Sequence, residues 1–154
     1  NALMPVCHEA DVPLVVAEHH RQVGPLGLDG VHVDQSRSAI RELRKTLGSD
    51  RIVGAFGGAS RHRAMTLAEQ GTDYVAMGPV GETGALGDGE RADHDLFAWW
   101  AEMIETPSVA EGGVGLEEAR TLGEVADFVV PDPRLVWEAE DPVRVIEAFA
   151  AALG

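Results

Sequence analysis

The chain has 154 residues and a formal net charge of −14, and this length is sufficient for one domain with a real hydrophobic core. Negative charge of this size argues against binding to nucleic acid or to an anionic membrane surface, and no apolar run approaches the roughly 18 residues of a membrane span. A single cysteine, Cys7, excludes an internal disulfide. Since no stretch resembles a signal peptide, these features predict a soluble cytoplasmic protein.

In chain order, six short apolar runs predict β-strands, and helical patterns lie between them. The predicted strands are 13–17, 30–33, 51–56, 73–77, 107–111 and 127–130. The predicted helices are 36–48, 60–71, 93–104, 115–125 and 141–153. Ser60 is a typical N-cap, Gly48 and Gly71 are typical helix stops, and Pro142 suits a first helical position. Residues 2–10 read as the end of a further helix.

The predicted strands are apolar throughout rather than alternating, which is typical of parallel strands buried on both faces. Six βα units of about 20–25 residues therefore form one α/β domain over residues 1–154. An open doubly wound sheet and a (β/α)₈ barrel both fit this pattern. Because the chain opens inside a helix–strand unit, we expect residues upstream to be missing, and about two more units would make eight.

The stretch GPVGETGALG, residues 78–87, is rich in glycine and follows an apolar run. Such a loop at the end of a barrel strand is suited to cradling a phosphate with main-chain N–H groups. This loop holds no Lys, Arg or Ser, however, and it carries Glu82. The loop therefore has the glycine-rich backbone of a phosphate loop but lacks a positively charged side chain.

Four stretches resemble, in the same order, the signature motifs of thiamine phosphate synthases. LDGVHVDQ (28–35) is similar to ADGVHxGQ, and GTDYVAMGPVGET (71–83) to GADYxxxGPxxxT. VAEGGV (109–114) is similar to VAIGGI, and VADFVV (125–130) to GADGVxV. The chain thus resembles a divergent member of the thiamine phosphate synthase and thiazole tautomerase family. The resemblance implies a (β/α)₈ TIM barrel whose first two βα units are absent from this chain.

The family resemblance also implies a reaction. It is the coupling of hydroxymethylpyrimidine diphosphate to thiazole phosphate, with release of pyrophosphate and with Mg²⁺ as cofactor, in thiamine biosynthesis. That chemistry needs carboxylates for the metal, a cation for the leaving diphosphate and main-chain N–H groups for the thiazole phosphate. The expected partners are small-molecule ligands. The oligomeric state is left open, with a homodimer among the options.

By this resemblance, four residues match the substrate- or phosphate-binding positions of the family: Gln35, Thr83, Gly112 and Gly113. Glu18 stands where the family has a metal-binding Asp, so it is the expected metal ligand. For the two adjacent glycines, a tight strand-to-helix turn is the alternative interpretation.

Other family positions are replaced. Arg37 stands in place of a second metal-binding Asp, and Leu86 in place of the Lys that holds the diphosphate. Residues 56–58 read Phe-Gly-Gly where the family has Ser/Thr-x-His. After the last strand, Pro131 and Pro133 lack N–H donors, and Asp132 adds a negative charge where a phosphate would lie. These replacements predict reduced or lost synthase activity.

Five acidic residues follow or end predicted strands: Glu18, Asp34, Glu82, Glu111 and Asp132. Either they are unrelated surface acids of an acidic protein, or they form a site remodelled for a metal or a cationic ligand. The second interpretation gives an alternative function, a non-catalytic or repurposed paralogue. His32 lies within a buried strand pattern and is interpreted as a packed core histidine.

Overall fold

The computed structural model describes residues 2–34, 39–83 and 89–154. Six strands form one sheet in sequence order, and every neighbouring pair is parallel. They are β1 (Val15–Ala17), β2 (Gly30–Asp34), β3 (Ile52–Gly58), β4 (Tyr74–Met77), β5 (Ser108–Val114) and β6 (Phe128–Pro131). All six predicted strands are confirmed. β5 continues three residues beyond its predicted end.

Helices follow the strands as the sequence predicts. They are α1 (Leu3–Glu9), the 3₁₀ turn η1 (His20–Gln22), α2 (Val23–Leu26), α3 (Ile40–Leu47), α4 (Arg61–Glu69), α5 (His94–Met103), α6 (Leu116–Leu122), α7 (Pro133–Trp137) and α8 (Pro142–Leu153). Ser60 caps α4 by accepting the Arg63 N–H, as expected. Within the described ranges, no helix is long and apolar enough to cross a membrane.

The short elements η1 and α2 were not predicted, and neither was helix α7. Its N-cap is Asp132, whose side chain accepts the Arg134 N–H, and Pro133 takes the first helical position. Proline suits that position because its missing N–H has no partner there in any helix. Pro133, which the sequence marks as a lost donor, thus also begins a helix, whereas Pro131 ends β6.

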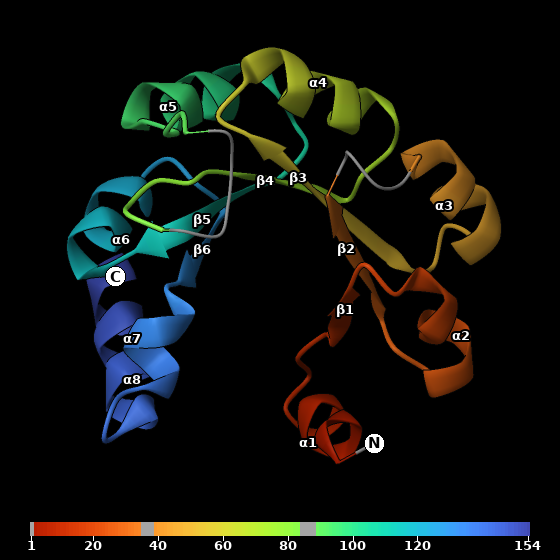
Figure 1. The fold of residues 1–154 in the computed structure, drawn as a ribbon, viewed down its shortest axis with the longest axis horizontal. Helices are drawn as coiled ribbons and strands as arrows, with labels where there is room; N and C mark the ends of the chain where they lie inside the picture. Colours follow the sequence, from red (N-terminus) through yellow and green to blue (C-terminus); the bar gives the residue numbers. More distant parts are fainter. Residues whose placement is uncertain (1, 35–38, 84–88) are drawn as a thin grey trace.

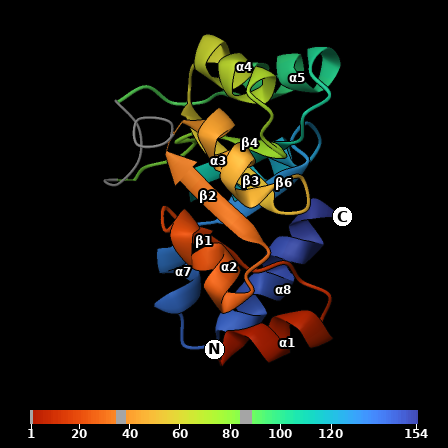
Figure 2. The same ribbon diagram turned by 90° about the vertical axis from the view of Figure 1, so that its right-hand side faces the viewer.

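The sheet curves into a half-barrel of the TIM-barrel type. Figure 1 shows the strands as an arc with α3, α4 and α5 along its outer side, and Figure 2 shows the same layers turned by 90°. A doubly wound sheet would carry helices on both faces, so the arrangement confirms the barrel alternative. β1 and β6 are the two end strands of the sheet. The expectation of two further βα units upstream stays a prediction.

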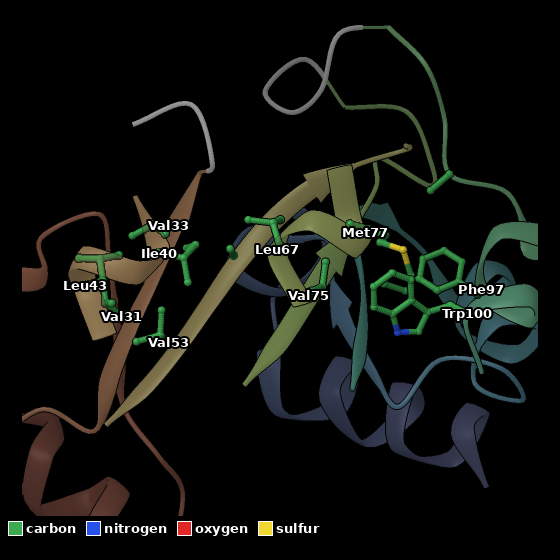
Figure 3. Packing of buried hydrophobic residues seen from close by; sticks show 14 of the residues in the cluster. Val31, Val33, Ile40, Leu43, Val53, Leu67, Val75, Met77, Phe97 and Trp100 are labelled. Atoms are coloured by element: carbon green, nitrogen blue, oxygen red, sulfur yellow. The ribbon is translucent and has the colours of Figure 1, made fainter. Parts of the chain in front are cut away.

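The main hydrophobic core lies between the convex face of the sheet and the helices. Strand residues that point outward pack against helix residues, and Figure 3 shows them interlocking: Val31, Val33, Val53, Val75 and Met77 from the strands, with Ile40, Leu43, Leu67, Phe97 and Trp100 from the helices. The indole N–H of Trp100 donates to the Thr106 carbonyl at 2.7 Å, so the buried ring leaves no polar atom unpaired.

Three aspartates at strand entries link neighbouring strands. Asp29 accepts the Leu14 N–H at 2.7 Å, Asp73 accepts the Val53 N–H at 2.6 Å, and Asp127 accepts the Ser108 N–H at 2.8 Å. Each carboxylate therefore satisfies a main-chain donor at the N-terminal end of the preceding strand. These aspartates come from three of the four family motifs, and each has a structural role at the end of the barrel opposite the expected site.

Candidate functional site

Most of the sequence-predicted site residues gather at the C-terminal ends of the strands, where barrel enzymes carry their sites. Glu18 follows β1, Asp34 ends β2, Glu82 and Thr83 follow β4, Gly112 and Gly113 lie near the end of β5, and Asp132 follows β6. Glu111 is the exception, because it lies within β5 on the concave face. Gln35 lies outside the described residues, as do Arg37 and Leu86.

A carboxylate and a main-chain N–H join the ends of β1 and β2. Glu18 Oε1 accepts the Asp34 N–H at 2.7 Å, and the Glu18 N–H donates to the His32 carbonyl at 2.9 Å. Glu18 also has a φ of 62°, a left-handed backbone that costs a non-glycine residue about 1–2 kcal/mol. Strain of this kind gathers at functional sites, where the surrounding bonds hold the residue in place.

Glu18 and Asp34 follow or end neighbouring strands, and both carry oxygen donors of the type that suits Mg²⁺. Mg²⁺ prefers oxygen ligands and is usually held by one or two carboxylates together with substrate phosphates and water. Among the described residues, no three His, Cys, Asp or Glu side chains group closely enough to hold a metal ion by themselves. A metal ion at Glu18 and Asp34 would thus need further ligands from the substrate or from water.

A second feature, the glycine junction, is formed by residues 78–83 after β4 and by Gly112 and Gly113 of β5. The N–H groups of Val80 and Gly81 both donate to the Gly112 carbonyl, at 2.9 and 3.0 Å. Gly112 and Gly113 have φ values of 86° and 71°, which favour glycine. The hydrogen bonds hold the two segments together at the rim.

The two segments touch backbone to backbone. A Cβ on Gly78 would lie 2.0 Å from the Glu111 carbonyl oxygen, and one on Gly81 would lie 2.0 Å from the Gly113 oxygen. A Cβ on Gly113 would lie 2.7 Å from the Gly81 carbonyl carbon. Close packing of the two segments alone therefore requires these glycines. Gly112 and Gly113 lie within β5, and the turn into α6 follows at Gly115. Phosphate binding at the junction stays a prediction.

The negative charge of Asp132 is compensated. Asp132 is 6% exposed and accepts two side-chain hydrogen bonds from Arg134, from Nε at 3.1 Å and from Nη2 at 2.6 Å. These bonds hold the pKa of the Asp132 carboxyl below its usual value. Arg134 Nη2 also donates to the Glu82 carbonyl at 3.0 Å, so it ties α7 to the glycine junction. Sequence reasoning missed this arginine, although it stands only two residues after Asp132.

Two other members of the acidic set also have nitrogen partners. Glu82 Oε1 lies 3.5 Å from Arg91 Nη2, and Glu111 Oε2 lies 3.8 Å from His32 Nε2. With Arg134 at Asp132 and Arg91 at Glu82, the rim carries less negative charge than the sequence alone suggests.

His32, Tyr74 and Glu111 form a polar cluster on the concave face, called here the lumen cluster. Tyr74 Oη lies 2.9 Å from His32 Nδ1, and the two rings stack with centroids 5.6 Å apart. Burial, with Glu111 and Asp73 nearby, raises the pKa of Tyr74 to about 12. Burial also raises the pKa of Glu111, although His32 opposes that shift. The cluster forms the polar side of a pocket of about 510 Å³ with apolar walls from β1, β5 and β6.

Known proteins are similar to this chain in sequence and in fold. The family model described as thiamine monophosphate synthase matches residues 1–129. A thiamine-phosphate synthase of Rhodospirillum centenum is 40% identical over 130 residues, covering 84% of this chain and 63% of the relative. A thiamine-phosphate synthase of Erythrobacter litoralis is 35% identical over 151 residues, covering 96% of this chain and 70% of the relative.

The solved thiamine phosphate pyrophosphorylase of Pyrococcus furiosus has the same fold. Its TM-score is 0.85 at 23% identity, covering 98% of this chain and 72% of that one. The chain thus spans about two thirds of the length of the proteins it matches. The match of the family model over most of the sequence, together with these relatives, shows that the chain belongs to the thiamine monophosphate synthase family.

Proposed function

We propose that this protein acts in thiamine biosynthesis, where it binds thiazole phosphate at the glycine junction and couples it to hydroxymethylpyrimidine diphosphate at a reduced rate or not at all. Membership of the family supports the pathway. The observation that supports the binding step is the glycine junction, where backbone rather than side chains lies at the strand ends. The N–H groups of Gly78, Val80 and Gly81 already donate to carbonyls, so the proposed phosphate donors are the N–H groups of Gly112 and Gly113.

A phosphate at a barrel rim is best held by main-chain N–H groups and a nearby cation. The junction is continuous with the end of β3, because the Gly78 N–H donates to the Gly58 carbonyl at 3.3 Å. The guanidinium of Arg63, from the first turn of α4, lies against Gly58: a Cβ there would be 2.5 Å from Arg63 Nη2. Arg63 thus places a positive charge beside the proposed phosphate site, where the family has a histidine.

Glu18 and Asp34 would hold Mg²⁺ together with the diphosphate of the second substrate. When bound, the metal ion would neutralise charge on the leaving diphosphate. Glu18 orients this end of the site through its hydrogen bond to the Asp34 N–H. The oxygen donors suit Mg²⁺, but the second metal-binding Asp of the family is Arg37 in this chain.

The proposed loss of rate follows from the replaced residues. Leu86 supplies no charge where the family uses Lys, and Phe56 supplies no hydroxyl where it uses Ser or Thr. Loss of one charge-stabilising group costs about 10²–10³ in rate. Arg63 offsets part of this loss by its position, since it approaches the phosphate site from α4 rather than from the loop after β4.

The test is a coupling assay with both substrates and Mg²⁺, run beside binding of thiazole phosphate measured by calorimetry. We expect binding with little or no turnover. Arg63→Ala should weaken binding about tenfold. The matched control is Arg61→Ala, which removes the same charge from the same turn but from a side chain stacked over Trp99, 4.7 Å from the ring centre.

Three outcomes would count against the proposal. Turnover at the rate of ordinary synthases would overturn the proposal that the reaction is slowed or lost. Absence of thiazole phosphate binding would overturn the role of the junction. Equal loss of binding in the two arginine variants would mean that net charge, rather than the position of Arg63, governs affinity.

A further inference from the structure

We infer that Glu111 is a positioning residue, which orients the imidazole of His32 and, through it, the hydroxyl of Tyr74, and thereby supports the glycine junction from the concave side of the barrel. The lumen cluster comes from strands far apart in the sequence, and Glu111 stands where the family motif quoted above has an apolar residue. The structure places the Glu111 side chain in contact with His32 on the concave face, so it is not a solvated surface acid.

The sheet is shaped to bring the cluster together. His32 is on β2, Tyr74 on β4 and Glu111 on β5, so the tyrosine ring must cross β3 to reach the histidine. Gly54 of β3 leaves that room: a Cβ on Gly54 would lie only 1.9 Å from Tyr74 Cζ. A glycine inside a strand weakens it unless another group needs the space. Here the tyrosine ring fills that space.

The two ring nitrogens of His32 face different partners, and this decides which one carries the proton. Glu111 Oε2 lies 3.8 Å from Nε2, an electrostatic contact rather than a hydrogen bond. The carboxylate favours the tautomer with the proton on Nε2, because that N–H is directed at a negative charge. Nδ1 is then the acceptor, and the Tyr74 hydroxyl, which stays protonated, donates to it.

Of the residues that the structure describes, only His32 pairs with the Glu111 carboxylate on the concave face. The side chains that line this pocket beside the cluster are apolar, and Val15, Val109, Phe128 and Val130 are among them. A carboxylate among apolar walls is costly unless it is paired. The pairing with His32 is thus the contact that stabilises Glu111 in this orientation.

The main chain of Glu111 connects the cluster to the site. Its carbonyl packs against Gly78, and the next two residues are Gly112 and Gly113 of the junction. The same residue therefore contacts the lumen cluster through its side chain and the junction through its backbone. A change in the side-chain contact would shift the segment that accepts the Val80 and Gly81 N–H groups.

The first test concerns His32 and does not depend on any ligand. Nitrogen-15 NMR at about pH 8.5, well above the ordinary histidine pKa of about 6.5, should show the wild-type ring with its proton on Nε2. Glu111→Ile, which restores the apolar residue type of the family motif, should shift this signal toward a mixture of tautomers. Glu111→Gln keeps an acceptor and should preserve most of the wild-type signal. An unchanged His32 signal in Glu111→Ile would overturn the inference.

The second test rests on the proposed function, because it uses binding of thiazole phosphate. We expect Glu111→Ile to weaken binding about tenfold and Glu111→Gln less than threefold. Tyr74→Phe should also weaken binding. The double variant Glu111→Ile with Tyr74→Phe should bind as tightly as the single variant with the lower affinity, because the two residues act through one chain of contacts. Additive losses would overturn the coupling.

The two tests separate the inference from the proposed function. If the wild-type protein binds no thiazole phosphate while the His32 signal still responds to Glu111→Ile, the proposed function fails and the positioning of His32 is supported. If the protein binds thiazole phosphate and Glu111→Ile binds equally well, the support of the junction by Glu111 is overturned and the proposed function stands.

Discussion

The two faces of the sheet differ in kind, although they are built by the same strands. On β2, Val31 and Val33 are fully buried on the convex side, while His32 between them faces the lumen. Successive side chains of a strand point to opposite faces, so one short run of sequence serves both. The convex face is a large hydrophobic core sealed by helices, whereas the concave face holds the lumen cluster, a pocket and a small apolar cluster that packs against Tyr74.

This contrast suggests a division of roles. Apolar burial on the convex face supplies most of the stability, because that contribution grows with the apolar area removed from water. The concave face and the rim carry polar contacts that add little net stability but hold groups in defined orientations. Substitutions on the two faces should therefore have different effects, and the following predictions are arranged from the largest expected effect to the smallest.

The largest effect is expected on the convex face. Leu67→Ala should lower the free energy of unfolding by about 2–5 kcal/mol, because Leu67 is fully buried and its loss leaves a cavity. Urea denaturation is the measurement. Glu69→Ala on the exposed side of the same helix is the control and should change the free energy by less than about 0.5 kcal/mol. A similar cost for both variants would contradict the sealed core.

The next effect concerns the rim. Gly113→Ala should cost about 1–3 kcal/mol in stability and weaken thiazole phosphate binding, since its Cβ would meet the Gly81 and Glu82 backbones. Gly48→Ala is a matched control, because Gly48 also has a positive φ, 78°, but a Cβ there meets nothing within 4 Å. The control should show the backbone strain without the loss of binding, measured by calorimetry. Loss of binding in both would point to strain alone.

A smaller effect is expected in the lumen cluster. Tyr74→Phe removes the hydroxyl that contacts His32 and should lower stability by only about 0.5–1.5 kcal/mol. Its main consequence should be in the His32 NMR signal rather than in the urea midpoint. A stability loss as large as that of Leu67→Ala would show that the concave face is a structural core as well, and the contrast between the faces would fail.

The smallest effect is a pH dependence at the rim. Arg134 lowers the pKa of Asp132, so their contact stabilises the folded state above the ordinary Asp pKa of about 3.9, and this stability is lost as the pH falls through the lower pKa of the folded state. Asp132→Asn should thus lose less stability than the wild type on acidification below about pH 4. Urea midpoints at neutral and acidic pH measure it. Equal slopes for both proteins would contradict the pairing.

Much of the fold was predictable, because local patterns carry it. Apolar runs marked every strand, and Ser60 marked the start of α4. Helix α7 was missed because Pro133 was judged by the donor it lacks, whereas Asp132 and Pro133 together form a helix start. The signal was present in the sequence, since an Asp followed by Pro is a typical N-cap and first helical residue.

The sequence by itself determined the alternation of strands and helices, the parallel sheet and the family, because these depend on short apolar runs and on motifs in a fixed order. Only the tertiary structure decided which charges meet. His32 and Tyr74 are 42 residues apart, and the barrel curvature, with the space at Gly54, brings their side chains into contact. Asp132 shows the same dependence, because its effect at the rim follows from the position of the Arg134 guanidinium, which the folded chain sets.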